Sequence, residues 1–308
     1  GLYPPGSTIK PYLAIGALDM NVITPDFSIS DPGWFELKNS EHVFGDSIPG
    51  GHGRVDLATA ITVSCDTYFY NLGSKMGIRR MDDILNQFGF GSTTGIDMDS
   101  ESAGILASPE WKKKAKGMSW FNGDTINSSI GQGFMQATPL QLASAAATLA
   151  SRGQRFMPYV LLGEQTPGKA YATQPPIPME SITLSSPGNW NMVIDAMEDV
   201  VNSPRGTARR YGKNHAYTLA AKTGTAQVIA KRGDVDEKDN QDNWSERLRD
   251  HHLFIAFAPI DHHKIAVADI TEKINVAIEA ARDMFDFYLG NKQNVNREPE
   301  ASSQKTGA

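Results

Sequence analysis

Cysteine is almost missing from this sequence of 308 residues, which contains only Cys65. A single cysteine excludes an intramolecular disulfide bond and leaves the redox compartment open. No run of about 18 apolar residues occurs, so none of these residues is predicted to form a membrane-spanning helix. A polybasic block is missing too, and 35 acidic residues outnumber 29 basic ones, which argues against charge-driven binding of nucleic acid. The chain also lacks an internal repeat, which excludes solenoids and propellers.

Apolar side chains are numerous enough for a folded core, because 40% of the residues are hydrophobic and five are tryptophan. Helical patterns dominate the first two-thirds of the chain, and strand patterns dominate the last third. We expect one domain over residues 1–290, of mixed α/β or α+β class, followed by a disordered polar tail over residues 291–308. The expected helices cover about residues 7–20, 55–76, 81–88, 139–151, 190–201 and 276–289, and the expected strands cover 218–229, 253–258 and 265–270.

The first pattern with chemical meaning is Ser7-Thr8-Ile9-Lys10, in which a hydroxyl and an amine stand three residues apart. If a helix begins near Ser7, both side chains lie one turn apart on the same face. The unpaired N–H groups of a helix start favour developing negative charge, and a partly desolvated Lys10 can act as a base for the Ser7 hydroxyl. Taken alone, the same pattern is also explained by an N-capping serine followed by a solvated lysine.

Two further patterns follow along the chain. Ser64 and Asp66 interrupt an otherwise apolar helical stretch, which helix propensity does not favour. Lys222-Thr223-Gly224-Thr225 lies in an expected strand, where the glycine permits close approach of a ligand. The strand N–H groups beyond it can bind an extended peptide or an oxyanion. An ordinary strand with a weak point is the alternative explanation of this pattern alone.

The patterns S-x-x-K, S-x-D and K-T-G occur in this order, which is far more specific than any one of them. The surrounding motifs are Tyr3-Pro4-Pro5-Gly6, Asp31-Pro32-Gly33-Trp34, Gly51-His52-Gly53-Arg54, Asp66-Thr67-Tyr68-Phe69-Tyr70, Gly123-Asp124-Thr125, Gly131-Gln132-Gly133, Ala137-Thr138-Pro139 and Thr225-Ala226-Gln227. With them, the chain resembles the penicillin-binding protein 2 family, the monofunctional class B peptidoglycan transpeptidases of elongation in rod-shaped bacteria. The resemblance covers about residues 2–290. It implies a serine β-lactamase/transpeptidase-like fold, with an antiparallel sheet flanked by helices and an all-helical subdomain.

The resemblance implies acyl transfer through a serine ester, with cross-linking of peptidoglycan stem peptides as the reaction. Ser7 would attack the D-Ala–D-Ala bond of the donor peptide, Lys10 would be its base, and Ser64 would pass a proton to the leaving D-alanine. Lys222 would hold this relay and help to bind the terminal carboxylate. No metal or organic cofactor is needed for this chemistry. β-Lactams, which mimic the donor, would leave a stable ester on Ser7.

The resemblance also implies how the substrate is held and where the protein works. Thr223 and Thr225 would donate hydroxyl groups to the terminal carboxylate on either side of Gly224, and the backbone N–H groups of Ser7 and Thr225 would form the oxyanion hole. The expected partners are stem peptides, β-lactams, a RodA-type glycosyltransferase of the SEDS class and other elongation-complex proteins. The expected location is the periplasmic side of the bacterial inner membrane, with an anchor helix upstream of Gly1 in a longer polypeptide.

Asp66 stands where this family usually has asparagine. An ionised Asp66 near Lys10 would favour the charged lysine and oppose its use as a base. Either Asp66 is protonated, therefore, or the lysine pair titrates as a coupled unit.

Two competing functions remain open. A serine β-lactamase would share the three patterns, but it needs a positioned water for rapid deacylation, and no convincing acidic loop for that water is found. A β-lactam sensor domain, which binds without turnover, is the alternative from another functional class. The fate of the acyl-enzyme distinguishes the three functions. A transpeptidase transfers the acyl group to an amine, a β-lactamase hydrolyses it rapidly, and a sensor domain retains it.

Cys65 belongs to a candidate metal site. Asp31, Asp46 and His52 lie upstream in a stretch rich in glycine and proline that has little core-forming power. One thiolate, one imidazole and two carboxylates form a plausible tetrahedral set for structural zinc, which would order this stretch behind the catalytic helix. The alternative is a small buried cysteine, two aspartates in turns and a histidine bonded to the backbone.

Overall fold

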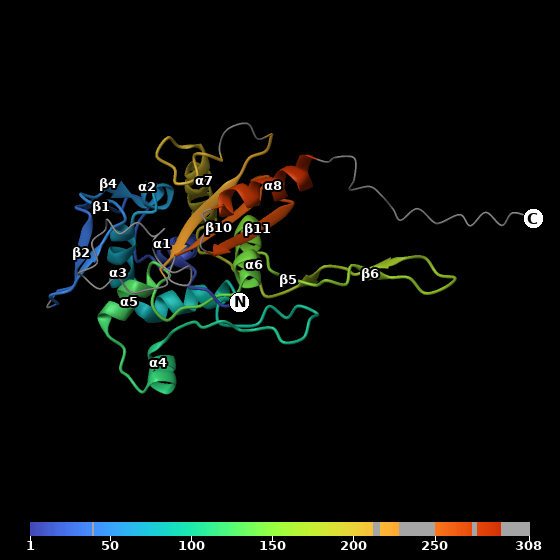
Figure 1. Ribbon diagram of the computed structural model, residues 1–308, viewed down its shortest axis with the longest axis horizontal. Coiled ribbons are helices and arrows are strands. Elements are labelled where there is room, and N and C mark those ends of the chain that lie inside the picture. The colour runs from blue at the N-terminus through green and yellow to red at the C-terminus, as the bar shows by residue number, and fades with distance from the viewer. Residues whose placement is uncertain (39, 212–215, 228–249, 273–275, 291–308) are drawn as a thin grey trace, which may run out of the picture.

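In the computed structural model, a three-stranded antiparallel sheet holds the centre of the molecule (Figure 1). The structure describes residues 1–38, 40–211, 216–227, 250–272 and 276–290. The strands are β9 (Ala220–Ala226), β10 (His251–Ala258) and β11 (Ile265–Glu272), in the order β11-β10-β9. The register sets Leu253 opposite Gly224 and Ile270. The last six residues of β10 are buried, because this strand has a neighbour on each side and helices over the sheet.

Four helices pack against this sheet or against each other beside it. The helices α6 (Pro139–Ala150) and α8 (Ala277–Gly290) contact β10 and β11, and α7 (Gly188–Asn202) contacts β9. A short 3₁₀ turn, η1 (Gly6–Ile9), leads into α1 (Lys10–Asp19), as the expected helix over residues 7–20 predicts. Every residue of α1 from Lys10 to Leu18 is buried, so this helix forms the centre of the hydrophobic core.

The expected continuous helix over residues 55–76 is wrong. The chain first forms β4 (Gly53–Asp56), then α2 (Leu57–Thr62), and then a turn before α3 (Asp66–Gln87). Ser64 lies in this turn with φ +61°, a left-handed conformation that costs free energy in a residue other than glycine. The Cys65 side chain caps α3 by accepting a hydrogen bond from the Tyr68 N–H at 3.3 Å.

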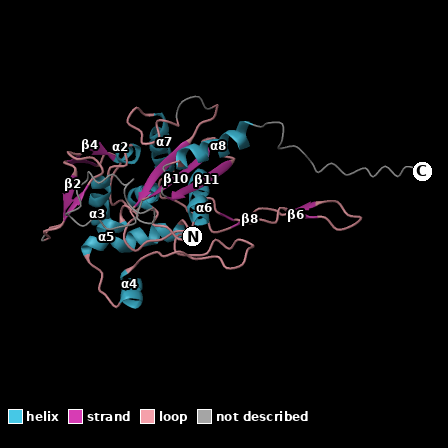
Figure 2. Cartoon of the chain, in the orientation of Figure 1, coloured by secondary structure: helices cyan, strands magenta, loops and turns pink. Residues whose placement is uncertain are grey.

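The remaining elements lie at the periphery of this core. With α3, the helices α4 (Pro109–Lys116) and α5 (Asn122–Ser128) form the helical part beside the sheet. Residues 28–56 add two short ribbons, in which β1 (Ser28–Asp31) pairs with β4, and β2 (Trp34–Glu36) pairs with β3 (Val43–Gly45). Residues 156–178 form an arm that extends from the body (Figure 2). Its pairs are β5 (Phe156–Met157) with β8 (Ile177–Pro178), and β6 (Gly163–Glu164) with β7 (Ala172–Thr173).

None of the helices in the described residues combines the length and apolar character needed to cross a membrane. The predicted polar tail over residues 291–308 and the end of the expected strand over residues 218–229 lie outside the described residues.

Candidate active site

Ser7 is the second residue of η1, in a turn that is confined on two sides. Gly6, just before it, has φ +52° and donates its N–H to the Gly131 carbonyl at 3.0 Å. A Cβ on Gly6 would lie 2.6 Å from the Thr225 carbonyl oxygen, and a Cβ on Gly131 would lie 2.1 Å from the Gly6 carbonyl oxygen. The two glycines therefore let the Ser7 turn fit between β9 and the Gly131-Gln132-Gly133 loop.

Lys10 connects the first pattern to the second. Its side chain is fully buried at the start of α1. Among the described residues, its ammonium group donates to the Ser64 carbonyl at 2.8 Å, to Ser64 Oγ at 3.3 Å and to Asp66 Oδ1 at 2.5 Å. The ammonium also lies 5.2 Å from the centre of the Phe69 ring. The left-handed turn at Ser64 is what brings its hydroxyl and the Asp66 carboxylate to the same amine.

Lys222 approaches the same hydroxyl from β9. Its Nζ donates to Ser64 Oγ at 2.8 Å and to the Thr223 carbonyl at 2.9 Å. Burial, and secondly the charge of Lys10, lower the pKa of Lys222, so that its neutral amine is favoured. Two amines on one hydroxyl can move a proton through Ser64, which is the relay that the resemblance to the family implies.

The three residues after Lys222 face different ways. Thr225 is exposed and Thr223 is half-buried, so both can meet a ligand along β9. Gly224 is buried, and a Cβ there would lie 2.8 Å from Thr8 Cγ2, so glycine lets β9 pack closely on η1. Gln132 donates its side-chain amide to the Thr225 carbonyl at 2.9 Å, which ties the Gly131-Gln132-Gly133 loop to the strand.

One residue near this strand was missed by sequence reasoning. The hydroxyl oxygen of Thr207 lies 2.7 Å from that of Thr223. Thr207 stands in the loop after α7, outside all three patterns. Its sequence neighbourhood carries no chemical signal that could have identified it, because the contact depends on how α7 packs against β9.

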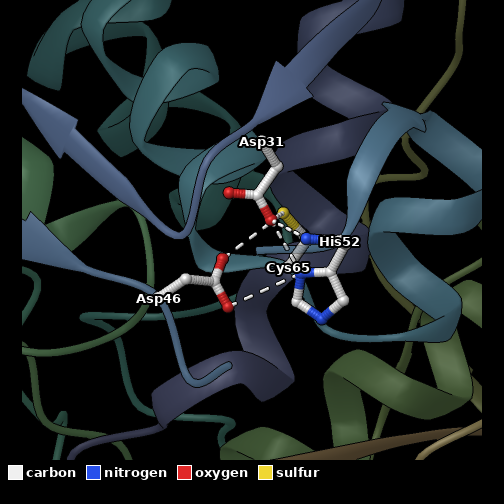
Figure 3. A group of neighbouring side chains, drawn as sticks. All are labelled: Asp31, Asp46, His52 and Cys65. Atoms are coloured by element: carbon white, nitrogen blue, oxygen red, sulfur yellow. Dashed lines mark hydrogen bonds and ion pairs between the residues drawn. The ribbon is translucent and has the colours of Figure 1, made fainter. Parts of the chain in front are cut away.

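The four candidate metal ligands come together, as Figure 3 shows. Asp31 ends β1, Asp46 follows β3, His52 precedes β4 and Cys65 caps α3. Their ligand atoms all lie within 4.8 Å of one another. The side chains of the two aspartates are fully buried and that of His52 is 4% exposed. The pairing of β1 with β4 thus closes a pocket of donors directly behind the Ser64 turn.

Most distances in this cluster lie near those of a tetrahedral metal site, and the shortest, between His52 Nδ1 and Asp31 Oδ2, is that of a hydrogen bond. His52 Nδ1 lies 2.8 Å from Asp31 Oδ2 and 3.7 Å from Asp46 Oδ1, and Cys65 Sγ lies 3.3 and 3.4 Å from the two carboxylates. Zinc bonds of about 2.0–2.3 Å at tetrahedral angles require ligand separations of about 3.3–3.7 Å. A thiol has one proton and can donate to only one of the two carboxylates, so a cation satisfies this set better than a proton does.

The pKa values of Asp31 and Cys65 in this cluster shift in opposite directions. Burial by itself raises the pKa of Asp31, but hydrogen bonds from the Gly33 N–H and from His52 lower it to about 2. Burial, and then the charges of Asp46 and Asp31, raise the pKa of the Cys65 thiol. Asp46 also accepts the N–H of Thr67 at 2.8 Å, which couples the cluster to the first turn of α3. Two buried carboxylates beside a protonated thiol are the arrangement from which a divalent cation displaces a proton.

Comparisons with known proteins identify the family of the chain. The family model described as "Penicillin binding protein transpeptidase domain" matches residues 1–283. The chain is 43% identical to the peptidoglycan D,D-transpeptidase MrdA of Acinetobacter baumannii over 293 residues, which are 94% of this chain and 43% of that protein. The crystal structure of Pseudomonas aeruginosa PBP2 in complex with WCK 5153 is 40% identical, with a TM-score of 0.81, over 94% of this chain and 59% of that one.

A second solved relative extends the comparison. The complex between penicillin-binding protein PBP2 and MreC from Helicobacter pylori is 29% identical with a TM-score of 0.79, over 94% of this chain and 50% of that one. The chain thus spans less than half the length of the curated relative and about half the length of the solved ones. The sheet, the helices beside it and the order of the three patterns are those of the serine transpeptidase fold. The chain therefore belongs to the penicillin-binding protein transpeptidase domain family.

Proposed function

We propose that this chain is the catalytic domain of an elongation-specific peptidoglycan D,D-transpeptidase, which cross-links stem peptides and is acylated by β-lactams. The observation that carries the proposal is the meeting of Lys10 and Lys222 at the Ser64 hydroxyl, with Lys10 also paired to Asp66 and standing three residues after Ser7. The likeness to the peptidoglycan D,D-transpeptidases supports it as well.

In the proposed reaction, Lys10 first passes a proton through Ser64 to the neutral Lys222 amine, which leaves Lys10 neutral. Ser7 Oγ then forms a bond to the carbonyl carbon of the penultimate D-alanine, and its proton moves to Lys10. The peptide C–N bond breaks, and the leaving D-alanine takes a proton through Ser64 from the lysine pair. The ester on Ser7 is then attacked by the amine of an acceptor stem peptide, and Ser7 regains its proton. Thr223 and Thr225 hold the terminal carboxylate, and the N–H groups of Ser7 and Thr225 stabilise the oxyanion.

The test is intact-mass spectrometry after treatment with benzylpenicillin, followed over hours. We expect one stable covalent adduct on the wild type and none on Ser7→Ala, because Ser7 is the hydroxyl at the helix start. Thr8→Val is the matched control, since it removes the neighbouring hydroxyl of η1, which donates to the Pro5 carbonyl at 2.6 Å. A full adduct on Ser7→Ala would overturn the assignment of the nucleophile.

The same experiment separates the alternatives. Transfer of the acyl group from a D-Ala–D-Ala peptide or thioester to an added amine supports a transpeptidase. Rapid loss of the penicillin adduct with release of hydrolysed product supports a serine β-lactamase. A stable adduct without transfer to any amine supports a β-lactam sensor domain.

For the cluster behind the Ser64 turn, we propose a structural zinc ion bound by Asp31, Asp46, His52 and Cys65. Zinc binding favours the native arrangement over the unfolded chain, so chelation lowers the melting temperature by several degrees, on the order of a few kcal/mol. It also slows acylation indirectly, since Cys65 caps α3 beside Ser64 and Asp66. No catalytic group is lost, and added zinc restores the melting temperature.

Elemental analysis of protein purified without added zinc tests this proposal, together with melting curves before and after chelator. His52→Ala should abolish both the bound zinc and the response to chelator. His42→Ala is the matched control, because this exposed histidine packs on Phe44 in the same stretch but lies outside the cluster. Less than about a tenth of an equivalent of zinc, with an unchanged melting curve after chelation, leaves Cys65 as a buried thiol.

We infer further that the full-length protein works in an elongation complex on the periplasmic side of the inner membrane, anchored by a helix upstream of this chain. The partners proposed are peptidoglycan stem peptides and a RodA-type glycosyltransferase of the SEDS class. The Helicobacter pylori relative, solved in complex with MreC, supports an assembly of this kind. Co-purification of the full-length protein with that glycosyltransferase from membranes tests the assignment, and its absence under conditions that preserve the complex of a relative contradicts it.

A further inference from the structure

Thr207 lies outside the machinery described above, yet its hydroxyl touches that machinery. Its Oγ1 is 2.7 Å from Thr223 Oγ1, and the two residues come from different elements, the loop after α7 and the strand β9. Thr207 is exposed and also lines a pocket of about 370 Å³. The Thr207 hydroxyl can therefore set the direction in which the Thr223 hydroxyl points its proton.

The position of Thr207 is set by its backbone rather than by its side chain. Its N–H donates to the Thr62 carbonyl at 3.3 Å, and the following Ala208 donates to the Val200 carbonyl at 2.9 Å. Gly206 is packed so closely that a Cβ there would lie 2.3 Å from the Val200 carbonyl oxygen. Removal of the Thr207 hydroxyl therefore leaves the loop where it is.

The direction of the hydrogen bond between the two hydroxyls matters for binding. Each hydroxyl has a single proton, and an ionised carboxylate only accepts. If Thr223 donates its proton to Thr207, it presents lone pairs to the carboxylate, which is repulsive. If Thr207 donates to Thr223, the Thr223 proton is left for the carboxylate, and the chain of two hydrogen bonds strengthens the second.

We propose that Thr207 is a positioning residue for substrate recognition: its hydroxyl donates to Thr223 Oγ1 and turns the Thr223 O–H toward the terminal carboxylate of the donor peptide or of a β-lactam. The inference rests on the proposed function, since it needs Thr223 to bind that carboxylate.

The charges around the pocket agree with an anionic ligand end. Arg209 and Arg210 line the same pocket as Thr207, and Arg209 also donates to the Pro204 carbonyl at 2.9 Å. Glu279 from α8 is the acidic residue of that lining. Among the described residues that line this pocket, two guanidinium groups stand against one carboxylate, and this excess of positive charge favours the approach of a carboxylate.

The experiment compares two variants and two probes. Thr207→Val keeps the shape of the side chain and removes the hydroxyl, whereas Thr207→Ser keeps the hydroxyl. Each variant and the wild type are treated with benzylpenicillin, which carries the free carboxylate, and with its methyl ester, which does not. The second-order rate of acylation is measured by intact mass, and melting curves report whether the fold is unchanged.

We expect Thr207→Val to acylate about tenfold more slowly with benzylpenicillin, since a hydrogen bond to a charged group is weakened, and within about twofold of wild type with the ester. Thr207→Ser should restore the rate with benzylpenicillin. An equal loss with both probes would show a merely structural role, and an unchanged rate with benzylpenicillin would show no role, so either overturns the inference. A wild type that forms no adduct overturns the proposed function, and the inference with it.

Discussion

The buried ion pair between Lys10 and Asp66 offers the sharpest test of how the site works. Asp66→Asn removes the negative charge but keeps an oxygen that can accept the Lys10 hydrogen bond, now 2.5 Å long. Both contacts of Lys10 with Ser64 remain possible in the variant. Because the family usually has asparagine here, we expect acylation by benzylpenicillin to stay within about tenfold of wild type, or about 1.4 kcal/mol in activation free energy.

Stability should respond more strongly than the rate. Lys10 is fully buried and Asp66 is 18% exposed, so the substitution leaves a buried ammonium without its counter-charge. Breaking a buried pair outright costs about 3–5 kcal/mol, and the retained amide acceptor reduces the expected loss to about 1–3 kcal/mol. For a domain of this size, that loss lowers the melting temperature by about 3–8 °C.

The chain contains a matched control in the pair Lys112–Asp124. Its N–O distance is 2.6 Å, and the two side chains are 2% and 17% exposed, close to the values for Lys10 and Asp66. Asp124→Asn should lower the melting temperature by a similar amount and leave acylation unchanged, because this pair joins α4 to α5 and bonds none of the three patterns. Together, the two variants separate the general effect of removing a buried negative charge from the effect of removing it in the active site.

The assay is the acylation rate by intact mass, measured beside a thermal melt of each variant. A loss of a thousandfold or so in Asp66→Asn, with a melting temperature like that of Asp124→Asn, would refute the reasoning. The Asp66 carboxylate would then be needed for proton transfer.

Two further substitutions test local features. Burial, and then the charge of Asp83, raise the pKa of Asp82 to about 7, so its ionisation destabilises the fold as pH rises from 4 to 7. Asp82→Asn should match wild type near pH 4 and exceed it by about 1–2 kcal/mol at pH 8 in urea unfolding; a pH-independent difference contradicts this. Gly131→Ala places a Cβ 2.1 Å from the Gly6 carbonyl oxygen and should slow acylation at least about tenfold, because it displaces the Ser7 turn. Gly117→Ala, with a similar φ of +68° and open space around it, should lose about 1 kcal/mol of stability and keep its acylation rate; equal effects of the two alanines on acylation would count against the steric argument.

Several features of the site were predictable because they are local. Ser7 and Lys10 stand three residues apart at a helix start, and η1 and α1 follow that pattern. The strand β9 carries Lys222 where strand propensity placed it. The grouping of the four candidate zinc ligands was predicted from donor chemistry, since a thiol, an imidazole and two carboxylates in a stretch with little core-forming power form a plausible zinc set. The structure brings these four together.

The conformation at Ser64 was not predictable from local pattern. The apolar spacing over residues 55–76 indicated one helix. The helix is instead interrupted between Thr62 and Asp66, where Ser64 adopts φ +61°. Helix propensity does not favour a left-handed serine, so the turn must be held by tertiary contacts. Lys10 supplies such contacts from 54 residues away, and Lys222 from 158 residues away.

The sequence by itself determined the family, the order of the three patterns and the residue types that carry the chemistry. Tertiary structure decided which of those groups meet: Lys10 bonds Ser64 and Asp66, Cys65 turns to the aspartates, and Thr207 reaches Thr223. The physical reason is the distance along the chain over which each kind of interaction acts. Helix and strand preferences act over a few neighbouring residues, whereas hydrogen bonds between distant segments exist only after α1, α7 and β9 have packed around a common core.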